Sequence, residues 1–183
     1  MIKLNSDYSG PFIPGLQLGE IAPGALDRIA RMYCRITRAL DGHWYLAVME
    51  KYGNEAALEL DRKVWPQVCR YEMARISQLL NIKGTDVATL MKAFQLEPFF
   101  IETKFRIDLK NNHYAVLTVD SCPILAALEK ENTGRESDIC KVVEPEILQA
   151  YAAYFNPDIK VTCLKIPPRA SQDDIACQWA FQS

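Results

Sequence analysis

Four cysteines in the last third of the chain are the residues best suited by type to form one chemical site. Cys122, Cys140, Cys163 and Cys177 fall in four successive segments, and no two of them form a close pair such as C-x-x-C. Thiolates bind zinc and iron, and they also act as nucleophiles. Free cysteines are also often small apolar side chains in a core, and this is the more common case. Three interpretations therefore stay open: a metal or iron–sulfur site, thiol chemistry, and simple burial.

Cys122 is the candidate nucleophile because it stands where a predicted strand ends and a helix begins, with Pro123 in the first helical position. Amide groups at a helix start favour a thiolate, so we expect a lowered pKa at Cys122. Asp120 precedes it by two residues and lies on the same face if the strand continues. Asp120 could orient a base, bind a cationic group, or cap the helix that follows.

The chain has two histidines, and both are candidate general bases. His43 lies in the run Asp41-Gly42-His43-Trp44-Tyr45 within a predicted helix, where a glycine permits close approach of a ligand or is simply tolerated. His113 follows two asparagines at a predicted hairpin tip, which is typical of a solvated turn residue. The predicted catalytic set is therefore Cys122, Asp120 and His43, and the predicted metal ligands are the four cysteines.

The first half of the chain has the apolar periodicity of helices. After an extended arm with several glycines and prolines over residues 1–23, one helix is predicted from 24 to Gly53, passing through Gly42. Asn54 is expected to cap the next helix, and Pro66 either kinks this helix or begins a new one that ends near residue 80. A short helix is expected from 85 or 86 to 94.

In the second half the apolar period changes toward two. Strands are predicted over 99–109 and 114–120 as a hairpin, and again over 159–166 and 175–181. Helices are predicted from 123 and from 144, with a polar loop over 129–138 between them. Cys163 and Cys177 stand equally far from Ala170 in the last turn, so we expect them to oppose each other across the ladder. The pattern predicts an α+β fold: N-terminal helical arms packed on a C-terminal antiparallel sheet of about four strands.

Length and composition restrict the functional classes. A chain of 183 residues suits one domain, with an arm over 1–23, a helical part over 24–97 and a sheet part over 98–183. A net charge of −2 argues against nucleic acid as a partner, and no nucleotide-binding motif is present. No apolar stretch is long enough to span a membrane, and the N-terminus does not resemble a signal peptide. We therefore expect a soluble, cytoplasmic protein with reduced thiols.

Several short runs carry a resemblance to a known family. They are Asp41-Gly42-His43-Trp44, Glu50 to Ala57, Val64-Trp65, Cys122-Pro123, Cys140, Cys163, and the closing Cys177-Gln178-Trp179-Ala180-Phe181. From about Asp27 onward the chain resembles an uncharacterised prokaryotic family found mostly in anaerobes. Its C-terminal half is similar to the aminothiazoline-carboxylate hydrolase-like family and, more remotely, to vinyl-reductase-like domains. The resemblance implies an α+β domain with a small molecule or metal at its cysteines; no catalytic set carries over residue by residue.

The leading prediction is a small domain with a cysteine-built site, in the C-terminal half, for a metal (zinc or an iron–sulfur cluster) or a small molecule. One alternative is a hydrolase-like enzyme acting on a small sulfur- or nitrogen-containing substrate through Cys122. A further alternative is a module without catalysis that forms a homodimer through its helical arms.

Overall fold

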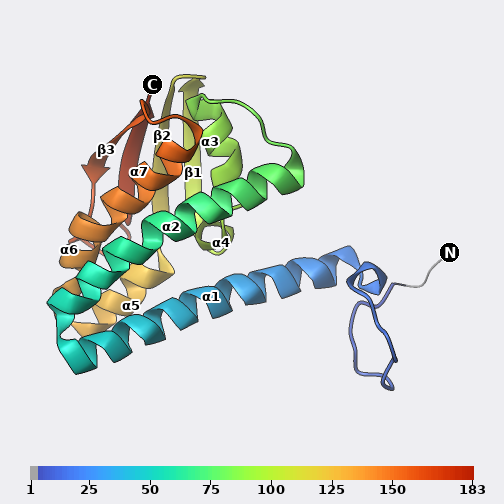
Figure 1. The fold of residues 1–183 in the computed structure, drawn as a ribbon. Coiled ribbons are helices and arrows are strands. Elements are labelled where there is room, and N and C mark those ends of the chain that lie inside the picture. Colours follow the sequence, from blue (N-terminus) through green and yellow to red (C-terminus); the bar gives the residue numbers. More distant parts are fainter. Residues whose placement is uncertain (1–3) are drawn as a thin grey trace.

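A computed structural model describes residues 4–183, and it confirms the predicted α+β class (Figure 1). The elements in chain order are η1 (Leu18–Glu20), α1 (Pro23–Tyr52), α2 (Asn54–Leu80), α3 (Val87–Phe94), α4 (Pro98–Ile101), β1 (Lys104–Asn111), β2 (Tyr114–Ser121), α5 (Pro123–Glu131), α6 (Arg135–Asp138), η2 (Ile139–Val143), α7 (Glu144–Phe155), β3 (Lys160–Lys165) and β4 (Cys177–Gln182).

The strands form one antiparallel sheet in the order β1-β2-β4-β3. Figure 1 shows α3 and α7 on the same side of this sheet. Alternate residues of β2 and β4, such as Leu117 and Trp179, are buried on this side. The other face carries polar pairs, including the ion pair between Arg106 and Asp120. This one-sided burial is the usual arrangement of an antiparallel sheet covered by helices on a single face.

The two long helices follow the apolar periodicity of the first half. α1 runs through Gly42 as predicted and ends at Gly53, whose positive φ of 88° suits a residue without Cβ. Gly53, and not Asn54, stands at the N-cap position of α2; the Asn54 side chain accepts a hydrogen bond from the Tyr45 hydroxyl. Pro66 lies inside α2 and begins no new helix. Figure 1 shows α1 and α2 meeting at their joined ends and then diverging.

The predicted strand start at Phe99 is wrong, because residues 98–101 form the short helix α4. Pro98 occupies the first helical turn, where its missing N–H costs nothing. The Glu97 carboxylate accepts hydrogen bonds from the backbone N–H groups of Phe99 and Phe100, at 2.9 and 3.1 Å. These bonds satisfy amides at the helix start and hold the segment out of the sheet, which begins only at Lys104.

The predicted polar loop over 129–138 is also largely helical. α5 continues to Glu131, and α6 with the π-helical turn η2 leads directly into α7. Gly134 makes the reversal possible with a φ of 79°. The Arg135 guanidinium then pairs with both carboxylate oxygens of Glu131 at 2.6 Å. Local charge pairing therefore organises a segment that composition alone suggested was irregular.

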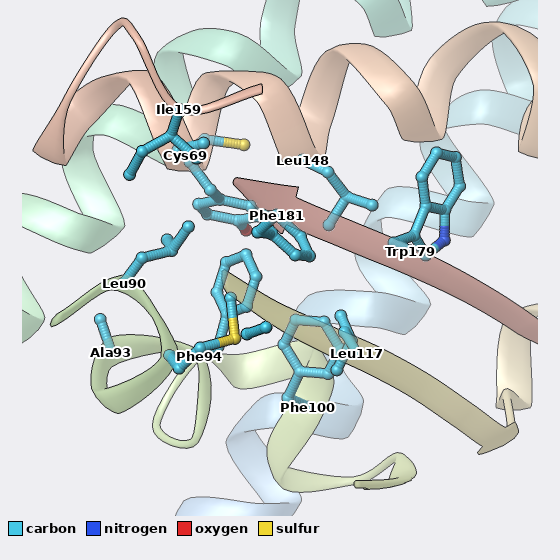
Figure 2. Close-up of a cluster of buried hydrophobic side chains, with 14 of the residues drawn as sticks. Cys69, Leu90, Ala93, Phe94, Phe100, Leu117, Leu148, Ile159, Trp179 and Phe181 are labelled. Carbon is cyan, nitrogen blue, oxygen red and sulfur yellow. The ribbon is translucent and has the colours of Figure 1, made fainter. Parts of the chain in front are cut away.

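A single cluster of buried hydrophobic side chains joins the helices to the sheet. Figure 2 shows Phe94 of the helical part between Phe100 of α4 and Phe181 of β4, and its ring contacts both of theirs. The ring centroids of Phe94 and Phe181 are 5.5 Å apart in an edge-to-face arrangement. Cys69 lies in this same cluster with no exposed surface, so it is a core residue.

No helix within residues 4–183 combines the length and the apolar character that crossing a membrane would require.

Candidate functional site: a cavity with a thiol wall

A cavity of about 460 Å³ lies between α1, α2, α5, η2, α7 and the sheet. Its volume falls in the range of small-molecule sites. Most of its walls are apolar, and the apolar side chains include Leu46, Phe99, Phe100, Val119, Ile124, Leu125, Leu128, Ile139, Val143, Ile147, Leu148 and Ile166. The cavity therefore offers space and apolar surface for a ligand with a substantial hydrocarbon part.

Three of the four predicted cysteines line this cavity. Cys122 comes from the residue before α5, Cys140 from η2 and Cys177 from the start of β4. Cys163 is exposed on β3 and is not part of the lining. We call the three lining cysteines the thiol wall. The sequence-based expectation of one shared neighbourhood thus holds for three positions and not for Cys163.

The predicted opposition of Cys163 and Cys177 is wrong. Cys163 pairs with Trp179 of β4, and Cys177 pairs with Val119 of β2. Counting from Ala170 assumed a symmetric connection, but β3 has an irregular register between Cys163 and Lys165. The two cysteines are therefore offset along the ladder.

The thiols of the wall are held in their neutral form. Burial raises the pKa of Cys122, and this outweighs the hydrogen bond from the Leu125 N–H to its sulfur at 3.4 Å. The expected lowering of this pKa by the helix start is therefore wrong. Burial, followed by the charge of Glu144, also raises the pKa of Cys140 and of Cys177. A neutral thiol is a weak nucleophile and a small apolar contact surface.

A metal ion would need several donors close together. Within residues 4–183, no three side chains of the His, Cys, Asp and Glu types are close enough to hold one. In the arrangement described, Cys122, Cys140 and Cys177 share a cavity without converging on a single point. Binding of zinc or an iron–sulfur cluster would require these sulfurs to move together; the Glu144 carboxyl lies near enough to raise the pKa of all three thiols.

Glu144 places a carboxyl group in the cavity wall beside the cysteines. It begins α7, and burial raises its pKa to about 7. As a residue Glu144 is only partly buried, and its carboxyl group forms no ion pair with the described residues. Its oxygens are not among the fully buried side-chain atoms that lack a partner, so they remain accessible to solvent or to a ligand.

Two nitrogen donors in the lining also lack partners. Nη1 of Arg38 and Nε1 of Trp179 are buried and have no partner with good hydrogen-bond geometry in the described part of the chain. The indole N–H of Trp179 is nevertheless near enough to the Cys177 sulfur to lower the pKa of this thiol against the effect of burial. Trp179 is only 1% exposed, and Figure 2 shows its indole at one side of the core cluster, away from Phe94. Arg35 and Arg135, which line the same cavity, are paired with Glu102 and Glu131. Arg38 is thus distinguished from its neighbours by a guanidinium nitrogen left free.

The predicted catalytic residues are only partly brought together. His43 lines the cavity from α1 but is exposed, so it lies toward the solvent side. Asp120 is not in the lining; its carboxylate pairs with Arg106 of β1 at 3.1 Å. The cap of α5 is the Cys122 side chain, so Asp120 does not cap this helix either. Cys122 and His43 share the cavity, and Asp120 does not join them.

Two further acids line the cavity from α1 and α2. Burial, together with the charge of Asp41, raises the pKa of Asp61 to about 7. Burial also raises the pKa of Asp41. Each group therefore disfavours ionisation of the other, and the pair binds protons more readily than exposed aspartates do.

Two lining residues, Glu97 and Tyr151, form a hydrogen-bonded cluster with Glu72, which lies outside the lining. The Tyr151 hydroxyl lies 2.7 Å from Glu72 Oε2 and 3.2 Å from Glu97 Oε1. Burial and the charge of Glu72 raise the pKa of Glu97 to about 8, so its carboxyl carries a proton at neutral pH. Protonated Glu97 can donate to the Tyr151 oxygen while Tyr151 donates to Glu72. Every member of this cluster is then satisfied.

Sequence reasoning found the cysteines but missed Arg38, Glu97, Glu144 and Tyr151. Glu97 and Glu144 each stand directly before a proline in the first turn of a helix, which is the one local signal they offer. Their distinguishing property is burial, and burial of a charged residue depends on segments far away in the chain.

The fold and the cavity together define a class: an α+β domain in which long helices and a four-stranded antiparallel sheet enclose a thiol-lined, mainly apolar site. The chain belongs to the family of unknown function DUF6125, whose model matches residues 25–183. No curated protein and no solved structure matches it. The family match covers α1 to β4, and so it includes every residue that lines the cavity.

Proposed function

We propose that this domain binds a small, mainly apolar molecule in the cavity, with the thiol wall and Glu144 in contact with it. The observation that supports this most is the gathering of Cys122, Cys140 and Cys177 in one cavity of about 460 Å³. Neutral thiols add polarisable, weakly polar surface to an apolar site. Partnerless polar groups in the same wall supply the few directed contacts that fix a ligand's orientation.

Nile red, a neutral fluorescent dye that brightens in apolar surroundings, tests this proposal with reduced full-length protein. Ala39 lines the cavity from α1 at an exposed position, and Ala39→Phe places a ring at the solvent side of the cavity. Ala47→Phe makes the same change on α1 outside the lining and is the matched control. We expect the first variant to weaken dye binding about tenfold and the second to leave it unchanged, because a ring occupies the volume of several buried methylenes. Equal binding by both variants would contradict the proposal.

The metal alternative of the cysteine site is tested separately. Elemental analysis of protein purified without oxygen should show about one equivalent of zinc or iron if the sulfurs converge on a metal, and Cys122→Ser should lower the occupancy. Protein without metal and with unchanged stability would count against this alternative and leave the small-molecule proposal in place.

The hydrolase alternative through Cys122 has less support. The raised pKa of this thiol opposes nucleophilic attack near neutral pH. Its sulfur accepts a hydrogen bond from the Leu125 amide and makes none with a histidine. The homodimer likewise stays a prediction; the observation relevant to it is a stripe of exposed apolar side chains on α1 that includes Tyr33, Leu40 and Trp44.

A further inference from the structure

The unpaired donors of the cavity narrow the kind of molecule that it would hold. This step rests on the proposed function and concerns the charge of the ligand. Arg38 leaves a buried Nη1 without an acceptor, and Trp179 leaves a buried indole N–H in the same lining. A buried donor without an acceptor costs on the order of 1–3 kcal/mol, and more when the donor is charged. A ligand that brings an acceptor to Arg38 would remove the cost of that charged donor.

The Arg38 guanidinium, with its unpaired donor, lies near the thiol wall. Its positive charge acts on the sulfur of Cys122, whose pKa it lowers against the dominant effect of burial. No ion pair within the described residues involves Arg38, whereas Arg35 and Arg135 are neutralised by Glu102 and Glu131. The lining therefore contains one guanidinium without an ion-pair partner, several acidic groups and many hydrocarbon side chains.

The charge of the acceptor is limited by the acids that share the lining. Asp41, Asp61 and Glu144 would repel a doubly charged group such as a phosphate monoester, since one guanidinium cannot offset two charges among carboxyls. A singly charged carboxylate matches one guanidinium and can accept two parallel N–H bonds from it. From Arg38, Trp179 and the apolar walls, we infer that the cavity takes an apolar monocarboxylate, with its carboxylate at Arg38 and its hydrocarbon part against the helices.

Displacement of Nile red by ligands of equal chain length tests the inference. Decanoate, decanol and decyl phosphate share one hydrocarbon chain and differ in the head group. At pH 7.5 we expect the protein to bind decanoate about tenfold or more tightly than decanol, the ratio expected of one charge-assisted hydrogen-bond pair. Arg38→Gln should reduce this ratio to about one, and Arg38→Lys should keep part of it. Arg70→Gln, an equal charge change at an exposed position on α2, should leave it unchanged.

The outcomes separate the two proposals. If the dye binds in the cavity but decanoate and decanol displace it equally, the carboxylate inference fails and the proposed function stands. Tighter binding of decyl phosphate than of decanoate would also overturn the carboxylate assignment. If the dye signal is indifferent to Ala39→Phe, the proposed function itself fails. Retention of the decanoate preference in Arg38→Gln would show that Arg38 is not the anchor.

Discussion

Glu97 and Glu144 both line one cavity and both have a pKa raised by burial, but Glu97 is completely buried whereas Glu144 is partly exposed. Glu97 is 0% exposed and accepts two backbone hydrogen bonds, and its other oxygen contacts Tyr151. Glu144 has no partner of this kind, and burial alone accounts for its raised pKa. Burial of an acid therefore does not by itself identify a functional group. A satisfied acid holds the fold together, whereas an unsatisfied one is available to a ligand.

The largest effect should follow from removing Glu97. Glu97→Leu leaves the N–H groups of Phe99 and Phe100 without acceptors at the start of α4, and Tyr151 loses a partner. We expect the free energy of unfolding, measured by urea denaturation at pH 6.5, to fall by about 2–4 kcal/mol. Glu97→Gln keeps an acceptor for the amides and a donor for Tyr151, so it should cost less than about 1 kcal/mol. An equal loss of unfolding free energy in Glu97→Leu and Glu97→Gln would contradict the structural role of the Glu97 hydrogen bonds.

The pH dependence of stability tests whether Glu97 is protonated in the folded protein. The pKa of Glu97 is raised from 4.5 to about 8 on folding, so the folded protein binds more protons than the unfolded chain between these values. The contribution of Glu97 to the free energy of unfolding is therefore complete below about pH 4.5 and is lost as the pH rises through 8. The difference between the wild type and Glu97→Gln should decline over this interval in urea titrations. A flat difference would show that Glu97 is already ionised at neutral pH.

Labelling of the cysteines tests whether the thiol wall is as sheltered as its burial indicates. Iodoacetamide at pH 7.5 should modify exposed Cys163 about tenfold faster than Cys122, Cys140 or Cys177, because these three thiols are less accessible. Burial raises the pKa of all four thiols, so exposure is the difference that decides the rates. Peptide mass spectrometry after timed quenching measures each rate. Fast modification of Cys122 alone would revive it as a nucleophile and would support the hydrolase alternative.

Glu144 should respond in the opposite direction to Glu97. Glu144→Gln removes a charge that has no hydrogen-bond partner, so stability at pH 8 should stay the same or rise by up to about 1 kcal/mol. At pH 5, where the wild-type carboxyl is protonated, the two proteins should differ less. A clear loss of stability in this variant would mean that Glu144 has a structural role after all.

Asp120 provides the smallest expected effect and a direct test of its predicted catalytic role. It forms an ion pair with Arg106 on the uncovered face of the sheet. Asp120→Asn should change the free energy of unfolding by about 0.5 kcal/mol or less, as is usual for exposed pairs, and should leave Nile red binding unchanged. A loss of binding would connect this face of the sheet to the cavity.

The sequence was sufficient for the parts of the fold that depend on local pattern. The periodicity of α1 and α2 and the alternation of β2 follow from side-chain polarity alone. The segment that begins at Phe99 was assigned wrongly because an aromatic run resembles a strand, and the Glu97 cap that makes it helical is itself secured by Tyr151, 54 residues away. The strand register that separates Cys163 from Cys177 depends on an irregularity that no local pattern reveals.

Of the candidate site, only the cysteines could be predicted from the sequence. Cysteines stand out in a sequence because they are few and chemically distinct. Arg38 resembles the other arginines of α1, and only its unpaired Nη1 sets it apart. Whether a side chain lacks a hydrogen-bond partner can be seen only in the folded chain, because any neighbouring segment could supply one.

Cys163 has one practical consequence for work on this protein. It lies on β3, at an edge of the sheet, with its thiol open to solvent. In aerated buffer two molecules can be oxidised to a disulfide-linked pair at this position. On a sizing column this product would be indistinguishable from a native dimer. Light scattering therefore requires a reducing agent or Cys163→Ser. A dimer that persists under both conditions would support association through the helices.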